Sequence, residues 1–147
     1  MRLTVKTNLA MRTLMYCAVH RGRVVRKSEI ARACNASPNH IGHVINKLSQ
    51  IGFIETLRGR GGGLRLAIPP ESISVGRVFR LFEANVPFAE CFSVAENHCP
   101  ITAACRLRGA ISNAIEAFYA ALDDVTLADL VQGNHALDAI LAQHETA

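Results

Sequence analysis

The sequence predicts a mainly α-helical fold with one small β-hairpin, and three observations support this fold class. A serine and a proline at 37–38 open a helix directly after a shorter helix and a tight turn. A glycine-rich tip over 58–63 separates two short apolar strands. An apolar stripe over 103–122 predicts one long helix. This order of elements is typical of a winged helix-turn-helix domain followed by a long C-terminal dimerisation helix.

Apolar spacing and capping residues set the expected elements of the first half. They are a helix over 9–19 capped by Thr7 or Asn8, a short helix capped by Ser28 that runs to Cys34, a helix from Pro38 to Gly52, and strands over 53–57 and 64–68. The third helix has the clearest pattern, because four apolar residues between 41 and 48 recur at the i, i+3, i+4, i+7 spacing of one helical face.

The second half predicts fewer elements. They are a helix from Ser74, an aperiodic segment over 86–101, the long helix, and a short last helix opened by Thr126 and Asp129 as a capping box. We therefore divide the chain into a winged helix-turn-helix domain at 1–68, a linker helix and cysteine loop at 69–102, and a dimerisation helix with a C-terminal segment at 103–147.

The long helix carries more apolar surface than a thin chain of this size buries alone, so we expect a twofold-symmetric homodimer. The residues expected at the dimer contact are Ile111, Ile115, Phe118 and Leu122.

Composition excludes several classes of protein. Half of the residues are hydrophobic, so the chain is not intrinsically disordered. No apolar run reaches the roughly 18–20 residues of a membrane span, and the first residues lack the apolar core of a signal peptide, so we expect a cytoplasmic protein without membrane contact. Five cysteines, an odd number, argue against a disulfide framework and towards metal, redox or core use.

Charge is divided unequally along the chain. Residues 1–65 hold 12 Lys and Arg and 2 acidic residues, a net charge of +10, whereas residues 66–147 hold 4 Lys and Arg and 10 acidic residues, a net charge of −6. A basic half joined to an acidic half suggests a polyanion-binding module joined to a second function.

The third predicted helix has a polar face opposite its apolar stripe. Asn39, His40 and His43 lie near its N-terminal end, where recognition helices contact base edges in the major groove. Asn46 and Lys47 continue this face. We therefore predict that the chain binds double-stranded operator DNA.

The hairpin tip is predicted to be a DNA-contacting wing. Its arginines suit phosphates or a narrow A·T-rich minor groove. A nucleotide-binding loop is disfavoured, because no Gly-Lys-Ser/Thr ending follows and no helix starts there. Across the chain, the expected DNA-contacting residues are Arg2, Lys27, Ser37, Asn39, His40, His43, Asn46, Lys47, Arg58, Arg60 and Arg65.

Three cysteines lie close together before the long helix. Cys91, Cys99 and Cys105 follow a C-x7-C-x5-C spacing, and thiolates suit an iron–sulfur cluster or zinc. The spacing lacks the paired C-x2-C knuckles of structural zinc sites, so cluster, zinc and unliganded thiols all remain open on the pattern alone. Cys17 and Cys34 lie on apolar helix faces and are expected in the core. The six histidines form no triad or paired-ligand motif, so we do not expect an enzyme.

The chain resembles the NsrR/IscR/RirA family of iron–sulfur winged-helix repressors. The resemblance rests on Met-Arg-Leu-Thr at 1–4, on the arginine- and glycine-rich run at 58–66 and on the three cysteines, and it covers nearly the whole chain. It implies a homodimer built on the long helix and operator binding governed by an iron–sulfur cluster on the three cysteines, with 4Fe–4S favoured over 2Fe–2S. The rival from another class is an iron–sulfur or zinc redox protein, which would not need the basic half and the wing.

Within the family, two branches share motifs with this chain. The runs at 45–49, 99–107 and 126–131 are similar to the NsrR branch, which implies nitric oxide as the signal. The cysteine spacing and the run at 14–18 resemble the iron-responsive RirA branch, which is the alternative. The fourth cluster ligand is open: part of the family uses an aspartate where this chain has Asn8, and the IscR branch uses a histidine where it has Arg108.

Overall fold

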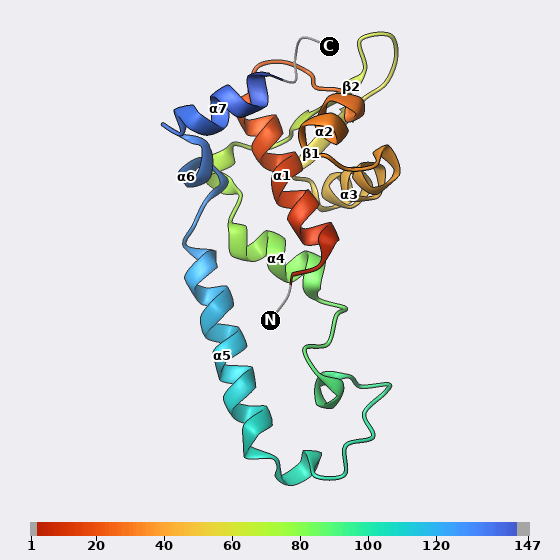
Figure 1. The fold of residues 1–147 in the computed structure, drawn as a ribbon, viewed down its shortest axis with the longest axis vertical. Coiled ribbons are helices and arrows are strands. Elements are labelled where there is room, and N and C mark those ends of the chain that lie inside the picture. The colour runs from red at the N-terminus through yellow and green to blue at the C-terminus, as the bar shows by residue number, and fades with distance from the viewer. Residues whose placement is uncertain (1–2, 144–147) are drawn as a thin grey trace.

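The computed structural model describes residues 3–143 and shows one long helix projecting from a lobe built mainly of shorter helices (Figure 1). The elements are α1 (Val5–Val19), α2 (Lys27–Ala33), α3 (Pro38–Ile51), β1 (Ile54–Leu57), β2 (Gly63–Leu66), α4 (Val75–Glu83), α5 (Arg106–Asp123), α6 (Leu127–Val131) and α7 (His135–Ala142). Short 3-10 turns occupy Pro70–Ser72, Glu90–Phe92 and Thr102–Ala104. Helix α5 extends away from the lobe. The loop at 84–105 connects the end of α4, in the lobe, to the start of α5 at its far end.

Helices α2 and α3 form the predicted helix-turn-helix. Asn35 in the turn between them has a φ of 48°, a left-handed conformation that asparagine tolerates better than most residues. The Ser37 side chain accepts the His40 N–H and Pro38 is the first helical residue, so the predicted start of α3 is confirmed. Gly52 ends α3 in the left-handed conformation, with a φ of 86°.

Strands β1 and β2 pair in antiparallel register from Ile54 opposite Leu66 to Leu57 opposite Gly63, which confirms the hairpin. Val25, just before α2, exchanges two backbone hydrogen bonds with Leu64, of 2.9 and 2.8 Å. A Cβ on Gly63 would lie 2.3 Å from the Val25 carbonyl oxygen, so only glycine allows this approach. The wing is therefore attached rigidly to the helix-turn-helix.

The core surrounds α1, whose Leu14 and Tyr16 are completely buried. Helices α6 and α7 return to this core and add Leu127, Val131 and Leu141. The C-terminal segment beyond α5 thus completes the N-terminal lobe. Within residues 3–143, no helix is both long enough and apolar enough to cross a lipid bilayer.

Three predicted helix starts are wrong. Helix α1 begins four residues early because the Thr4 side chain, and not that of Thr7 or Asn8, accepts the capping hydrogen bond. Helix α2 begins after Arg26, whose N–H donates to the Glu29 carboxylate, so Ser28 lies inside the helix. Helix α5 begins only at Arg106, because 102–104 form a separate 3-10 turn.

Candidate nucleic-acid interface and cysteine loop

The predicted reading face of α3 is open to solvent. Asn39, His40, His43 and Asn46 are all exposed, while Ile41, Val44, Ile45 and Leu48 on the opposite side are buried against the lobe. Burial of the apolar stripe therefore directs the polar side chains outward. Four hydrogen-bonding side chains over two helical turns match what a major-groove helix presents to base edges.

Two predicted DNA contacts lie in different surroundings from the rest. The Lys47 ammonium lies 4.6 Å from the centroid of the Phe82 ring on α4, and Lys47 is half-buried. Arg65 donates a hydrogen bond to Glu55 directly across the hairpin. Both cations therefore have partners within their own chain. Arg2 lies outside the described residues.

The wing tip presents its remaining basic side chains to solvent. Arg58 and Arg60 are exposed on either side of Gly59, which has a φ of 99°. Lys27 is exposed at the start of α2 beside Gly42 of α3. Ser37 is exposed too, but its side chain already caps α3. The surface around α3 and the wing is therefore basic, as the charge division along the chain predicts.

Asn8, a candidate for the open fourth ligand position, is exposed on α1. It lines a groove of about 460 Å³ together with Arg12, Ser37 and His40. The Arg12 guanidinium donates a hydrogen bond of 3.1 Å to the Cys34 carbonyl, which holds the groove wall. Asn8 thus lies close to the N-terminal end of α3, and its exposed side chain is accessible to groups outside α1.

The three loop cysteines are half-buried free thiols held in different local structures. The Cys91 carbonyl accepts a hydrogen bond of 3.0 Å from Arg108 of α5. The Cys99 N–H donates to the Asn97 side chain at 3.1 Å, an Asx-type turn. Cys105 is the N-cap residue of α5, and its side chain makes no capping hydrogen bond.

Within residues 3–143 the structure brings no three His, Cys, Asp or Glu side chains together at a metal site. The donor set nevertheless fits an iron–sulfur cluster, because three soft thiolates occur within fifteen residues on one loop. None of residues 83–126, all of them described, is buried. The loop therefore has no core of its own that would resist rearrangement around a cluster.

Cys17 and Cys34 are core residues, as predicted. Burial, together with the neighbouring Cys34, raises the pKa of the Cys17 thiol to about 12. Burial also raises the pKa of Cys34, against the opposing charge of Arg12. Both groups stay protonated at neutral pH, and a protonated thiol is neither a nucleophile nor a metal ligand.

Alkylation should separate the two sets of cysteines. In the metal-free native protein at pH 8, we expect iodoacetamide to modify Cys91, Cys99 and Cys105 and to leave Cys17 and Cys34 unmodified, because burial excludes both the reagent and the thiolate form. Peptide mass spectrometry measures the modified sites. Unfolded protein, in which all five should react, is the control, and modification of Cys17 as fast as Cys99 would contradict this assignment.

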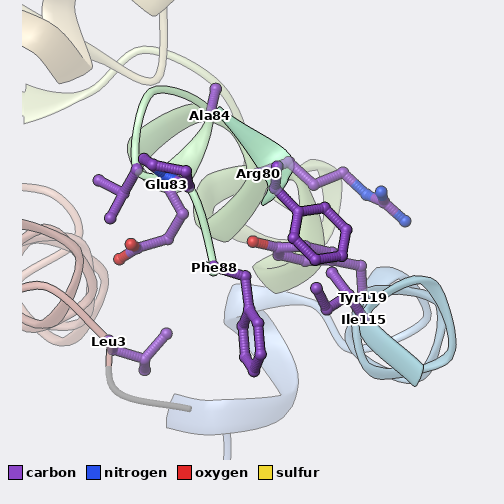
Figure 2. Close-up of a pocket in the computed structure, with 10 residues that line it drawn as sticks. Leu3, Arg80, Glu83, Ala84, Phe88, Ile115 and Tyr119 are labelled. Carbon is purple, nitrogen blue, oxygen red and sulfur yellow. The ribbon is translucent and has the colours of Figure 1, made fainter. Parts of the chain in front are cut away.

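Helix α5 has two distinct faces. Its half-buried face packs on α4: the Phe118 and Phe79 ring centroids are 6.3 Å apart, and Leu122 contacts the core. Ile115 lines a cavity of about 740 Å³ between α4, α5 and the cysteine loop (Figure 2). The other face is an exposed stripe of small residues and one leucine, here called the alanine stripe: Leu107, Ala110, Ala114, Ala117 and Ala121.

Ion pairs reinforce the contact between α4 and α5. Arg80 of α4 bonds Glu116 at 3.2 Å and Asp123 at 3.0 Å, and its guanidinium lies 4.6 Å from the Tyr119 ring centroid. Of the four residues predicted at the dimer contact, three lie partly against their own chain: Ile115, Phe118 and Leu122. A dimer contact through Ile111, Ile115, Phe118 and Leu122 remains a prediction.

An exposed reading helix, an attached basic wing and a core built around α1 define a winged-helix DNA-binding transcriptional regulator. Residues 3–133 match the family model Rrf2, described as an iron-dependent transcriptional regulator. The chain belongs to the Rrf2 family. The prediction of a regulator and not an enzyme is confirmed, because its relatives and structural neighbours are regulators.

Relatives extend over the full length of the chain. The HTH-type transcriptional regulator NsrR of Bacillus subtilis is 38% identical over 146 residues, which cover 99% of this chain and 100% of that protein. NsrR of Geobacillus kaustophilus is 40% identical over 144 residues, covering 97% and 98%. Among solved structures, T. potens IscR has a TM-score of 0.70 at 25% identity and covers 90% of this chain and 87% of that one.

Sequence reasoning missed the residues that hold the elements together. The resemblance marks Arg108 only as the residue at a family ligand position, yet its guanidinium donates a hydrogen bond to the Cys91 carbonyl. No sequence motif marks Glu83, although its carboxylate accepts hydrogen bonds from Thr4 at the start of α1. An Asx turn at Asn97 has a local signature, because the side chain bonds an N–H two residues on. Glu83 has no such local signature, since its hydrogen-bond partners Thr4 and Thr7 lie 79 and 76 residues away in the chain.

Proposed function

We propose that this chain is a homodimeric repressor whose operator affinity depends on an iron–sulfur cluster held by Cys91, Cys99 and Cys105, with nitric oxide as the signal. The observation that carries the proposal is the contrast between the two halves. Residues 3–82, completed by α6 and α7, build a core behind an exposed reading face, whereas no residue from 83 to 126 is fully buried. A segment of this length needs other surfaces to order it, and a cluster and a second subunit are the two that its chemistry suits.

The three cysteines would supply thiolate ligands from one loop. Thiolates bind iron strongly, and Cys105 would supply one of them from the N-cap position of α5. The cluster would supply iron that nitric oxide attacks. Candidates for a further donor are Asn8, Glu90, Glu96 and His98, and Glu90 already accepts the His98 N–H at 2.6 Å. A neutral amide such as Asn8 is a weak ligand, so we propose a labile fourth position, with 4Fe–4S favoured over 2Fe–2S.

The alanine stripe, together with the predicted residues Ile111, Ile115, Phe118 and Leu122, would form the dimer contact. Small side chains allow two helices to approach closely, and a twofold axis along α5 would set the separation of two reading helices. Ordering of the loop at 84–105 would brace α4, and α4 supports the lobe that carries α3. Loss of that order would misalign the two readers and release the operator.

Anaerobic purification tests the proposal. We expect visible absorbance, with iron and sulfide in near-equal amounts, and tight operator binding that nitric oxide abolishes. Iron chelation without nitric oxide addresses the alternative, because an iron-responsive regulator of the RirA type would release DNA at low iron and respond little to the gas. Operator binding that is the same with and without the cluster would contradict both.

The wing gives a separate prediction. Arg60→Ala should weaken operator binding. It should also make the negative slope of log affinity against log salt shallower by about 0.9, because one phosphate contact is lost. The loss should be largest on sites with A·T-rich flanks, where arginine inserts into a narrow minor groove. Fluorescence anisotropy across a salt series measures both quantities.

The matched control is Arg21→Ala, which removes an exposed arginine paired with Glu71. An unchanged salt slope in Arg60→Ala would show that the wing does not contact the phosphates.

A further inference from the structure

The last turn of α4 is attached to α1 by one carboxylate. Glu83 Oε1 accepts hydrogen bonds from the Thr4 N–H and the Thr4 hydroxyl, both at 2.9 Å, and from the Thr7 hydroxyl. Thr7 is completely buried. Figure 2 shows the Glu83 side chain directed away from Arg80 and towards α1. Glu83 therefore satisfies the first turn of α1 from another helix.

The preceding residue reaches the recognition helix. Phe82 is buried, and the Lys47 ammonium of α3 lies 4.6 Å from its ring centroid, within cation–π distance. Burial alone would raise the pKa of Glu83, but hydrogen bonds from Thr7 and Thr4 and the charge of Lys47 outweigh it, so that its pKa lies below the usual value. Two consecutive residues of α4 thus hold both α1 and α3.

These contacts lie where the cysteine loop begins. Glu83 is the last residue of α4, Ala84 is its C-cap, and no residue from there to Cys105 is buried. The same helix also packs on α5 through Phe79 and Arg80. The last turn of α4 therefore joins the loop directly to the lobe.

Building on the proposed function, we propose that Phe82 and Glu83 are positioning residues that couple the state of the cysteine loop to the DNA-reading helix. Displacement of this turn would break the Thr4 and Thr7 hydrogen bonds and shift Phe82 under Lys47. Asn8 lies one helical turn beyond Thr4, and its N–H bonds the Thr4 carbonyl at 3.2 Å. The contact therefore also sets the position of the candidate ligand on α1.

Three variants test the coupling. Glu83→Leu removes the acceptor, Thr7→Val removes a donor from the opposite side, and Glu83→Gln keeps an Oε1 that can accept the same bonds. The matched control is Glu71→Leu, which removes an exposed carboxylate that bonds Gln132 at 3.1 Å and lies opposite Arg21. For each full-length protein, operator affinity is measured in the cluster-loaded and cluster-free states, and hydrogen exchange is measured over 4–8 and 38–47.

In the wild type, we expect the loaded state to bind the operator more tightly and to protect both segments. In Glu83→Leu and Thr7→Val, the ratio of loaded to cluster-free affinity should fall about tenfold, the size expected for losing hydrogen bonds to a charged acceptor. The visible absorbance of the cluster should be unchanged. Glu83→Gln should retain most of the ratio, and Glu71→Leu all of it.

The outcomes separate the two proposals. Suppose that the ratio of loaded to cluster-free affinity exceeds one in the wild type and is unchanged in both Glu83→Leu and Thr7→Val. That result would overturn the coupling and leave the proposed function intact. An equal loss of affinity in both states would also overturn it, because that is the result of a merely structural contact. A wild-type ratio of one would overturn the proposed function and the coupling with it.

Discussion

Replacement of Ala114 by glutamate is expected to convert the protein to monomers and to weaken operator binding by about a hundredfold or more. Ala114 lies on the alanine stripe and is exposed in the single chain, so a charge there costs the isolated fold little. In a dimer the same charge would be buried without a partner. Two linked readers on two half-sites gain a factor of about 10²–10⁴ over one, and monomers lose that gain.

The matched control is Ser112→Glu, which adds the same charge on the opposite side of α5, where Ser112 is also exposed. Ile115→Glu should have the same effect but tests the dimer less cleanly, because Ile115 lines a cavity against its own α4. Sedimentation equilibrium gives the mass. A monomeric wild type at micromolar concentration, or a dimeric Ala114→Glu protein, would rule out this interface.

Cys91→Ser, Cys99→Ser and Cys105→Ser are each expected to abolish cluster retention and every cluster-dependent change in operator binding. A hydroxyl stays protonated at neutral pH and binds iron poorly, so each variant loses one of three thiolates. Visible absorbance and iron and sulfide content after anaerobic purification measure the loss. The expected effect is complete, because no other thiol of the loop can replace the missing ligand.

The control variants are Cys17→Ser and Cys34→Ser, which should keep the cluster spectrum because both thiols are buried and protonated. Asn8→Asp should slow loss of absorbance to a chelator, since a carboxylate is a better iron ligand than an amide. Cluster retention in any one of the three loop variants would remove that cysteine from the ligand set.

The sequence by itself was enough for the elements whose signals are local. Ser37, Pro38 and Gly52 mark the start and end of α3, and its apolar spacing identifies the face that is buried. The glycine-rich tip between two short apolar strands predicts the wing, and Thr126 with Asp129 predicts the start of α6. Each of these signals lies within one short continuous stretch of the chain, so the local sequence is enough to reveal it.

The tertiary structure decided the roles of individual side chains. Lys47 looks like a phosphate contact on the helix, but packing of α4 places Phe82 under its ammonium, and antiparallel pairing places Glu55 opposite Arg65. Which face of α5 is free depends on where α4 lies, and Glu83 finds its partners 79 and 76 residues away. Such contacts depend on how complete elements pack together, and no local spacing in the chain encodes that packing.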